Sequence, residues 1–295
     1  MNDATVSPRA QEIERQFRAM PMTGAFDLAQ ERQNTKDAHV LTGVPEDVLM
    51  EWDTIAGVRC IRMRPRNARP DREVIFLHGG AYCLMSAMTH HRFGGHIANA
   101  ACADVIIPDY VLAPEAPYPQ ARDDCMRIYE ERRTHGPAQQ ILAGDSAGGG
   151  LVLSVACAMR NAGIVGPDAL IMMSPWLDLS MSGPLLQAGK IEDPILSIHN
   201  LTALADLYRG SIPAADPGAS PLFADLSGLP RTLLQISEKD LLREDGERLA
   251  KRWPDPATLT VQTYAGMLHS FQMFAGDMPE ADAAIAEITT FLDSS

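Results

Sequence analysis

Ser146 is the residue whose neighbours best fit a nucleophile. It lies in Gly144-Asp-Ser-Ala-Gly148, after the apolar run QQILA and before GGLVLSVACAMR, which has the composition of a helix. A sharp turn from strand to helix exposes a serine hydroxyl above the edge of a sheet, and glycines let the flanking backbones pass closely. A glycine–serine turn that merely begins a helix is the alternative. The flanks and the partner residues below favour Ser146 as a nucleophile.

Backbone N–H groups that could hold a negative oxygen are expected after the apolar run EVIFL. His78-Gly79-Gly80-Ala81 follows that run, and glycines let a loop turn its amides toward a developing oxyanion. We predict an oxyanion hole from the N–H groups of Gly79, Gly80 and Ala147, the residue after the nucleophile. An ordinary Gly-Gly turn is the alternative. His78 is interpreted as a residue that braces this loop, because it precedes the nucleophile.

Two histidines follow Ser146 and are candidates for the general base. His199 lies in SIHNLT, within a long segment that contains no clear strand, whereas His269 lies in GMLHSF, directly after the strand-like run ATLTVQTYAG. A loop just beyond the carboxyl end of a strand places its side chains where sites gather in such sheets. We therefore predict His269 as the base.

The acid that orients the base is expected in the loop after RTLLQIS. This loop and the residues after it offer Glu238, Asp240, Glu244 and Asp245. Asp240 lies at the tip of the loop, whereas the later two carboxylates could instead stabilise the start of a helix through its dipole. We predict Asp240 as the acid, with Glu238 as the alternative.

Short apolar runs alternate with segments that suit helices, and this rhythm predicts the scaffold. Residues 48–64 read as two strands around a turn at Ala56-Gly57. Continuous apolar runs separated by helices indicate buried parallel strands with helices on both faces of the sheet. We expect one domain over residues 1–295. The expected strands are EVIFLH, ADVIIPDY, QQILAGD, ALIMMSP, RTLLQIS and ATLTVQTYAG, and the expected helices are 88–102, 120–134, 147–162, 241–252 and 279–292.

Two segments outside this rhythm are predicted to cover the site. One is residues 1–45, where Ile13, Phe17 and Met20 form an apolar stripe at helical spacing. The other is the excursion 180–215, which is rich in proline and glycine and in which LTALADLYRG looks helical. A long excursion between sheet strands is often a lid or a binding element. The alternative is that both segments pack on the outside of the core.

Charge and cysteine usage limit the classes of partner. The formal net charge is -13 and the isoelectric point is about 5.0, which disfavours nucleic acids and stable anchoring to an anionic membrane. The five cysteines form no CxxC pair, and the N-terminus has no apolar run typical of a signal peptide. We expect a soluble, cytoplasmic protein. His78, His90, His91 and His96 match no metal-binding motif, so we predict neither a catalytic metal nor a cofactor.

The chain resembles the hormone-sensitive-lipase-like esterases, a microbial branch of the α/β-hydrolases, from about residue 40 to the C-terminus. The matching stretches are HGGAY (78–82), DYVLAPEAPYPQARDD (109–124), GDSAGG with its Ser146, SPWLDLS (174–180), SPLFADLSGLP (220–230), EKDLLREDGERLA (238–250) and GMLHSF (266–271).

This resemblance implies an eight-stranded sheet of the α/β-hydrolase fold with a helical cap, ester hydrolysis without a cofactor, and a homodimer as a plausible assembly. It places Ser146, Asp240 and His269 on the family's triad positions and Gly79 and Gly80 on its oxyanion glycines. Two departures stand out in the sequence. Ala81 replaces the third glycine of the usual HGGG, and Leu241 follows Asp240 where the family often has proline.

The function expected from these residues is hydrolysis of short- to medium-chain acyl esters or lactones through an acyl-enzyme intermediate, with a small-molecule ester as the partner. An amidase or N-acetyl deacetylase would use the same tetrahedral chemistry and remains an alternative. A ligand receptor that has lost catalysis is a third reading, because fold alone does not determine function. The intact serine, histidine and aspartate argue against that reading.

Overall fold

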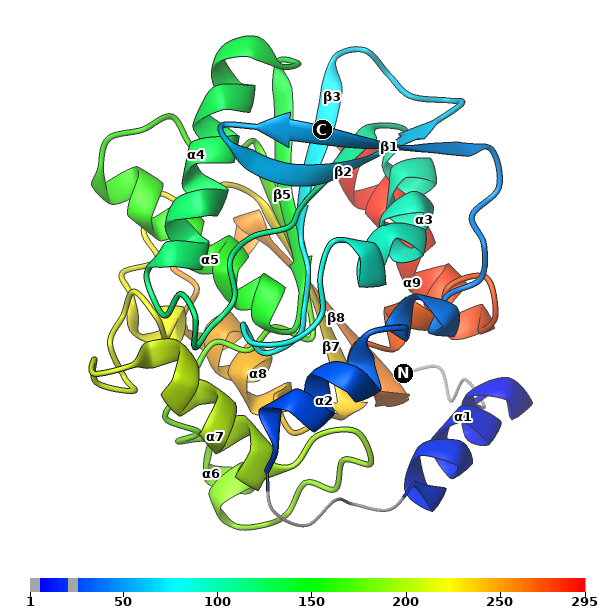
Figure 1. Ribbon diagram of the computed structural model, residues 1–295, viewed down its shortest axis with the longest axis vertical. Coiled ribbons are helices and arrows are strands. Elements are labelled where there is room, and N and C mark those ends of the chain that lie inside the picture. Colours follow the sequence, from blue (N-terminus) through cyan, green and yellow to red (C-terminus); the bar gives the residue numbers. More distant parts are fainter. Residues whose placement is uncertain (1–5, 21–25, 295) are drawn as a thin grey trace.

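An eight-stranded sheet forms the centre of the molecule (Figure 1). The computed structural model describes residues 6–20 and 26–294. The strands lie in the order β1-β2-β4-β3-β5-β6-β7-β8. Their bounds are β1 Val48–Ile55, β2 Val58–Pro65, β3 Arg72–Leu77, β4 Asp104–Pro108, β5 Gln139–Asp145, β6 Ala169–Met173, β7 Thr232–Lys239 and β8 Leu259–Leu268.

The sheet is mostly parallel, as the sequence predicts. β1 pairs antiparallel with β2 and β2 with β4, while the pairs from β4 through β8 are parallel. The turn of the first hairpin is Ala56-Gly57, as predicted, with φ of 50° and 80°. Two positive φ values suit the tight turn that matches the twist of a hairpin. The carboxyl ends of β3, β5, β7 and β8 therefore meet at one edge, where the predicted site residues follow them.

Helices cover both faces of this sheet. Their bounds are α1 Pro8–Ala19, α2 Leu28–Thr35, α3 His91–Ala101, α4 Gln120–His135, α5 Ala147–Asn161, α6 Pro184–Gln187, α7 Ile198–Arg209, α8 Arg243–Arg252 and α9 Pro279–Asp293. One buried core contains side chains of α4, α5 and α8, and a second contains those of α3 and α9. The layered arrangement predicted from the apolar runs is thereby confirmed.

Two helices have no counterpart among the sequence predictions. α2 buries none of its residues, so it carries no apolar stripe that a helical pattern could reveal. Its local signal is the N-cap Asp27, whose side chain accepts the N–H groups of Ala29 and Gln30. Arg32 then fixes the helix to the body, because its guanidinium donates to the carbonyls of Cys83 and Ala113. The other helix, α6, is a single turn.

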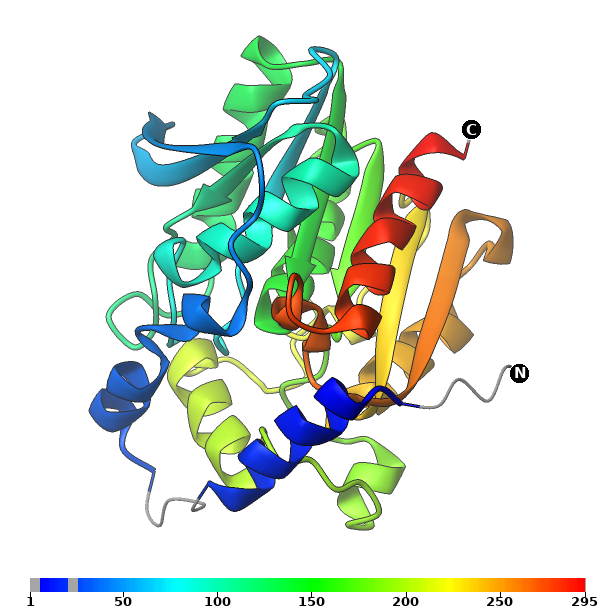
Figure 2. The same cartoon turned by 90° about the vertical axis from the view of Figure 1, so that its right-hand side faces the viewer.

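Helices α1, α2, α6 and α7 gather at the end of the molecule toward which the parallel strands point (Figures 1 and 2). The predicted covering segments 1–45 and 180–215 supply these helices, although residues 1–5 and 21–25 lie outside the described part. Within the described ranges, no helix is both long and apolar enough to cross a membrane.

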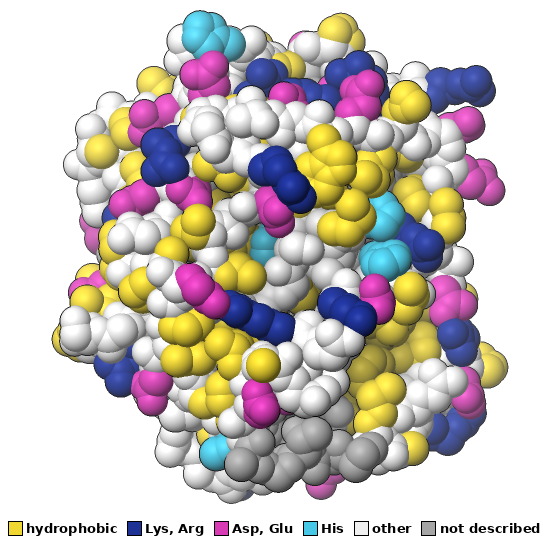
Figure 3. Space-filling view, in the orientation of Figure 1, with side chains coloured by type: hydrophobic (Ala, Val, Ile, Leu, Met, Phe, Trp, Pro, Cys, Tyr) yellow, Lys and Arg dark blue, Asp and Glu magenta, His cyan; other side chains and the backbone are white. Residues whose placement is uncertain are grey.

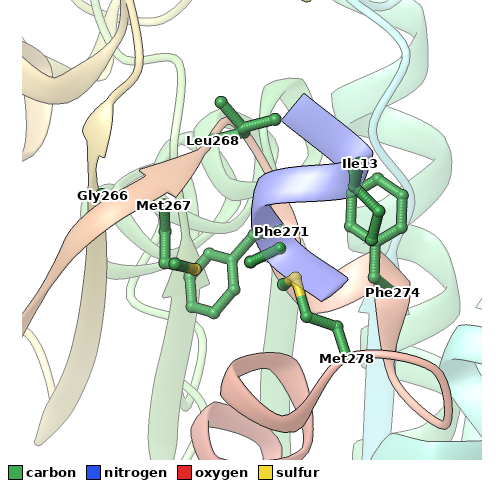
Figure 4. A pocket seen from close by; sticks show the side chains of 8 residues that line it. Ile13, Gly266, Met267, Leu268, Phe271, Phe274 and Met278 are labelled. Atoms are coloured by element: carbon green, nitrogen blue, oxygen red, sulfur yellow. The ribbon is translucent and has the colours of Figure 1, made fainter. Parts of the chain in front are cut away.

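The N-terminal part of the predicted apolar stripe packs α1 against the body of the protein. Ile13 is buried and lies against the segment that follows β8, where it lines a small cavity with Phe271, Phe274 and Met278 (Figure 4). Phe17 is partly buried and packs its ring edge-on against Phe274, with the centroids 6.1 Å apart. Met20 is 58% exposed. The side chains of the stripe therefore become more exposed from Ile13 to Met20.

Candidate active site

Ser146 lies at the junction between β5 and α5, in the turn predicted for it. Its φ of 51° and ψ of -123° form a strained conformation that non-glycine residues rarely adopt. The two glycines of the motif are required by close packing. A Cβ on Gly144 would lie 2.6 Å from Gly148, and a Cβ on Gly148 would lie 2.0 Å from the carbonyl oxygen of Leu77 at the end of β3. The turn therefore fits only because both positions lack a side chain.

His269 and Asp240 lie in line with the serine. His269 Nε2 is 2.9 Å from Ser146 Oγ, and His269 Nδ1 is 3.0 Å from Asp240 Oδ2. A carboxylate only accepts, so Nδ1 carries the proton and Nε2 is left to accept the serine hydroxyl. All three side chains are buried. The structure thus brings together the three residues that the sequence predicts as nucleophile, base and acid.

The two alternatives from the sequence lie elsewhere. Glu238 is exposed, and its Oε2 accepts the N–H of Gly266 at 2.7 Å. His199 lies on the exposed side of α7. Asp240, by contrast, is fully buried, and its second oxygen accepts the Leu242 N–H at 2.8 Å. This second bond fixes the carboxylate with one oxygen aimed at His269.

The surroundings of His269 favour its protonated form. Burial is the largest single influence and by itself would lower the pKa of His269. The charge and hydrogen bond of Asp240 act in the opposite direction, as do the charges of Asp193 and Asp145, and together they hold the pKa above its ordinary value. A neutral base is therefore available only at higher pH than for an exposed histidine.

The prediction that the Gly79 N–H is an oxyanion donor is wrong. This N–H donates to Asp145 Oδ1 at 2.9 Å, so it is already occupied by a buried carboxylate. Burial opposes ionisation of Asp145, but the charges of His90 and His269 and the bond from Gly79 outweigh it and lower the pKa of Asp145. Asp145 thereby ties the glycine loop to the nucleophile turn.

The loop places the next two residues beside the nucleophile instead. Gly80 and Ala81 line the same cavity as Ser146, whereas Gly79 does not. Ala81 has a φ of 51°, a left-handed conformation that favours glycine. Ala147 is the first residue of α5, where the N–H has no partner within the helix. The part of the loop that lines the cavity beside Ser146 therefore begins one residue later than predicted, at Gly80. Asp145, the acidic residue before Ser146, is the sequence feature that could have indicated this shift.

His78 braces the glycine loop, in agreement with its interpretation from sequence. Its Nδ1 lies 2.7 Å from the carbonyl oxygen of Gly79, and its ring stacks on Tyr110 at a centroid distance of 4.1 Å. Burial, together with the nearby His90, lowers the pKa of His78 to about 3. A neutral, fully enclosed imidazole of this kind serves structure and takes no part in proton transfer at the serine.

A cavity of about 430 Å³ opens from Ser146 toward the helices at the end of the sheet. One part of its wall is apolar and another is polar. The apolar part includes Phe17, Met20, Val40, Leu41, Met85, Ile195, Leu196, Leu201, Leu204, Met273 and Phe274, and the polar part includes Glu31, Asn34, Thr35, Asp37, Ser197 and Asn200. The surface of the molecule near the helices at the end of the sheet mixes acidic, basic and hydrophobic side chains, and no one charge dominates it (Figure 3).

Comparisons with a family model, with related sequences and with solved structures all indicate the same family. The model of the alpha/beta hydrolase fold family matches residues 74–273. LipR of Mycobacterium tuberculosis is 35% identical over 247 residues, covering 83% of this chain and 80% of its own length. An esterase of Acinetobacter venetianus is 37% identical over 245 residues, covering 81% of this chain and 80% of its own. An acetyl-hydrolase of Streptomyces hygroscopicus is 32% identical over 276 residues, covering 92% and 89% of the two chains.

Solved structures extend the likeness over nearly the whole chain. An esterase of the bacterial hormone-sensitive lipase family superposes with a TM-score of 0.91 at 33% identity, covering 97% of each chain. The esterase EstE5 gives a TM-score of 0.91 at 29% identity, covering 97% of this chain and 98% of its own. The chain is a hydrolase of ester bonds and belongs to the α/β-hydrolase fold family, on its hormone-sensitive-lipase-like branch.

Proposed function

We propose that the protein hydrolyses short- to medium-chain carboxylic esters through a Ser146–His269–Asp240 triad and an acyl-enzyme intermediate. The observation that carries this proposal is the continuous line of hydrogen bonds from Ser146 Oγ through both ring nitrogens of His269 to Asp240. This line ends at a serine that lines a cavity large enough for a small-molecule ester.

The reaction proceeds in two halves. His269 Nε2 removes the proton from Ser146 Oγ as the oxygen attacks the ester carbonyl carbon, and the imidazolium then gives this proton to the departing alcohol. A water attacks the acyl-enzyme with His269 again as the base, which releases the acid and restores the serine. Asp240 holds the ring with its proton on Nδ1 and stabilises the imidazolium in both halves.

The oxyanion is held by the N–H groups of Gly80, Ala81 and Ala147. This assignment rests on their positions around Ser146 and on the bond that removes Gly79 from the set. The start of α5 adds the positive end of a helix dipole near the same point. Donors fixed by the backbone need no reorganisation as the charge develops.

The pH profile of kcat/KM tests the base. A neutral His269 is required, so kcat/KM should rise with pH through a single limb, with its midpoint above the ordinary histidine value of about 6.5. The raised pKa of His269 sets this direction. Initial rates with a soluble ester from pH 5 to pH 9 would measure the limb, and a flat profile in a reaction limited by chemistry would contradict a histidine base.

The length of the acyl chain tests whether the helices α1 and α7 act as a cap. If their apolar side chains bound the acyl site, each added CH₂ should raise kcat/KM by up to about fourfold until the site is full, and longer chains should gain nothing. Phe17 lines the cavity, so Phe17→Ala should shift the optimum toward longer chains.

The matched control lies on the same helix. Ile13→Val also shortens an apolar side chain of α1, but Ile13 belongs to the separate small cavity and should leave the optimum unchanged. A series of p-nitrophenyl esters from acetate to palmitate would be run on the native protein, on both variants and on a chain lacking residues 1–25. Equal profiles for all four, with a preference for palmitate, would refute the cap.

Whether the protein prefers esters or amides can be tested by comparing the two kinds of substrate. The triad chemistry serves both bonds, so matched p-nitrophenyl esters and acyl anilides would be compared as substrates. We expect the esters to react faster by at least about 10³-fold, because an anilide leaves less readily than a phenolate.

Five free cysteines, four of them buried, support a reducing, cytoplasmic location as part of this proposal.

A further inference from the structure

A second aspartate lies beside the base and acid and has no role in the reaction described above. Asp193 belongs to the segment between α6 and α7, and its side chain is partly buried. Its Oδ1 accepts the N–H groups of Ile195 at 2.7 Å and Leu196 at 3.0 Å. These two residues line the cavity next to Ser146, so one oxygen of Asp193 shapes the cavity wall.

The other oxygen of Asp193 reaches the loop that carries the catalytic acid. Asp193 Oδ2 accepts the N–H of Leu241 at 3.0 Å. Leu241 is adjacent to Asp240, whose own Oδ1 accepts the N–H of Leu242. Two carboxylates therefore hold successive N–H groups of the same turn. This links the backbone of the acid loop to a segment that is 48 residues away in the sequence.

Asp193 and Asp240 are two negative charges close together, and no positive charge on His269 offsets them when that histidine is neutral. His269 faces Asp240, Asp193 and Asp145, and Asp193 faces both Asp240 and His269. Two basic residues close in sequence or by contact to this segment pair with other carboxylates: Lys239 with Glu14 at 2.7 Å, and Arg18 with Glu14 and Glu192. Burial, and then repulsion from Asp240, raises the pKa of Asp193. A positive charge on His269 relieves that repulsion.

We propose that Asp193 is a positioning residue for the triad, which holds the Asp240 loop against the cavity wall and stabilises the imidazolium of His269. The proposal rests on the triad proposed above and extends it to a fourth side chain. At a pH where the resting His269 is neutral, the imidazolium forms as the reaction proceeds, so a carboxylate beside it favours the transition state over the resting enzyme.

The test is Asp193→Asn, with Glu192→Gln as the matched control. The side-chain oxygen of asparagine can still accept the N–H groups of Ile195 and Leu196. The substitution removes the negative charge, and it puts an NH₂ group where the second oxygen accepted the N–H of Leu241. Glu192 is the neighbouring residue of the same segment, its side chain is 86% exposed, and it bears the same charge. The two variants therefore differ in whether the lost carboxylate contacts the acid loop.

We expect Asp193→Asn to move the acid limb of kcat/KM to lower pH, because a neutral neighbour no longer favours protonated His269. The ratio of kcat/KM at pH 6 to that at pH 9 should rise at least about twofold. On the alkaline plateau kcat should fall about tenfold, with KM changed less than about twofold. Glu192→Gln should match the native protein in all three quantities.

An acid limb at its native position in Asp193→Asn overturns the proposal even if kcat falls, because loss of a structural contact does not move the limb. Circular dichroism and a thermal melt would establish that the variant folds. If it does not, Asp193→Ser removes the same charge with a shorter side chain that can still cap the turn at Ile195 and Leu196. We expect that variant also to move the limb to lower pH, and a limb at its native position would overturn the proposal. Failure of the triad itself would be distinct, because the native protein would then show no histidine limb.

Discussion

Replacement of Ser146 by alanine should lower kcat by at least about 10⁴-fold while the fold remains intact. The hydroxyl lies 2.9 Å from His269 Nε2, and no other serine has both that contact and a position at the nucleophile turn among the described residues. Alanine fits the same strained turn, because it only removes an oxygen from the side chain. Steady-state hydrolysis of a soluble p-nitrophenyl ester would measure the loss.

A second serine on the helix that follows the nucleophile supplies the control. Ser154 lies on α5 and is buried, but its hydroxyl donates to the carbonyl oxygen of Gly218. Ser154→Ala should keep kcat within about threefold of the native value. A fluorophosphonate probe should label the native protein and Ser154→Ala, but not Ser146→Ala. Near-native turnover of pure Ser146→Ala would remove Ser146 from the mechanism.

Replacement of Asp240 by asparagine should lower kcat by about 10³- to 10⁴-fold. The carboxamide oxygen can keep the N–H of Leu242, which Asp240 Oδ1 accepts in the native protein. The NH₂ group of asparagine then faces His269 Nδ1, which must become the acceptor. The proton moves to Nε2, and the ring can no longer accept the proton of Ser146. The same ester assay would measure the change in kcat.

Glu238 is the control for this variant, because it is a carboxylate of the same strand end without a contact to His269. Its side chain is exposed and accepts the N–H of Gly266. Glu238→Gln should therefore change kcat by less than about threefold. A larger loss in Glu238→Gln than in Asp240→Asn would exchange the roles of the two residues.

The sequence by itself predicted the scaffold and the three side chains that the structure brings together, Ser146, Asp240 and His269. Apolar runs such as EVIFL and ALIMM have no polar alternation and are too short for typical helices, so between helical segments they indicate strands covered on both faces. The turn glycines at 144 and 148 and the positions of Asp240 and His269 just beyond β7 and β8 are local features, read from residues that are neighbours in the chain. Local pattern is sufficient there, because the topology of a parallel sheet collects these strand ends at one edge.

Tertiary structure alone decided which N–H of the glycine loop is bonded to a carboxylate and which carboxylates surround His269. Gly79 and Asp145 are 66 residues apart, and only the pairing of β3 with β5 brings the N–H of one to the carboxylate of the other. α2 has no apolar stripe and is fixed through Arg32 to carbonyls at least 51 residues away. Asp193 meets the acid loop for the same reason. Hydrogen bonds between distant segments leave no periodicity in a sequence, because each depends on a single polar atom placed by the fold.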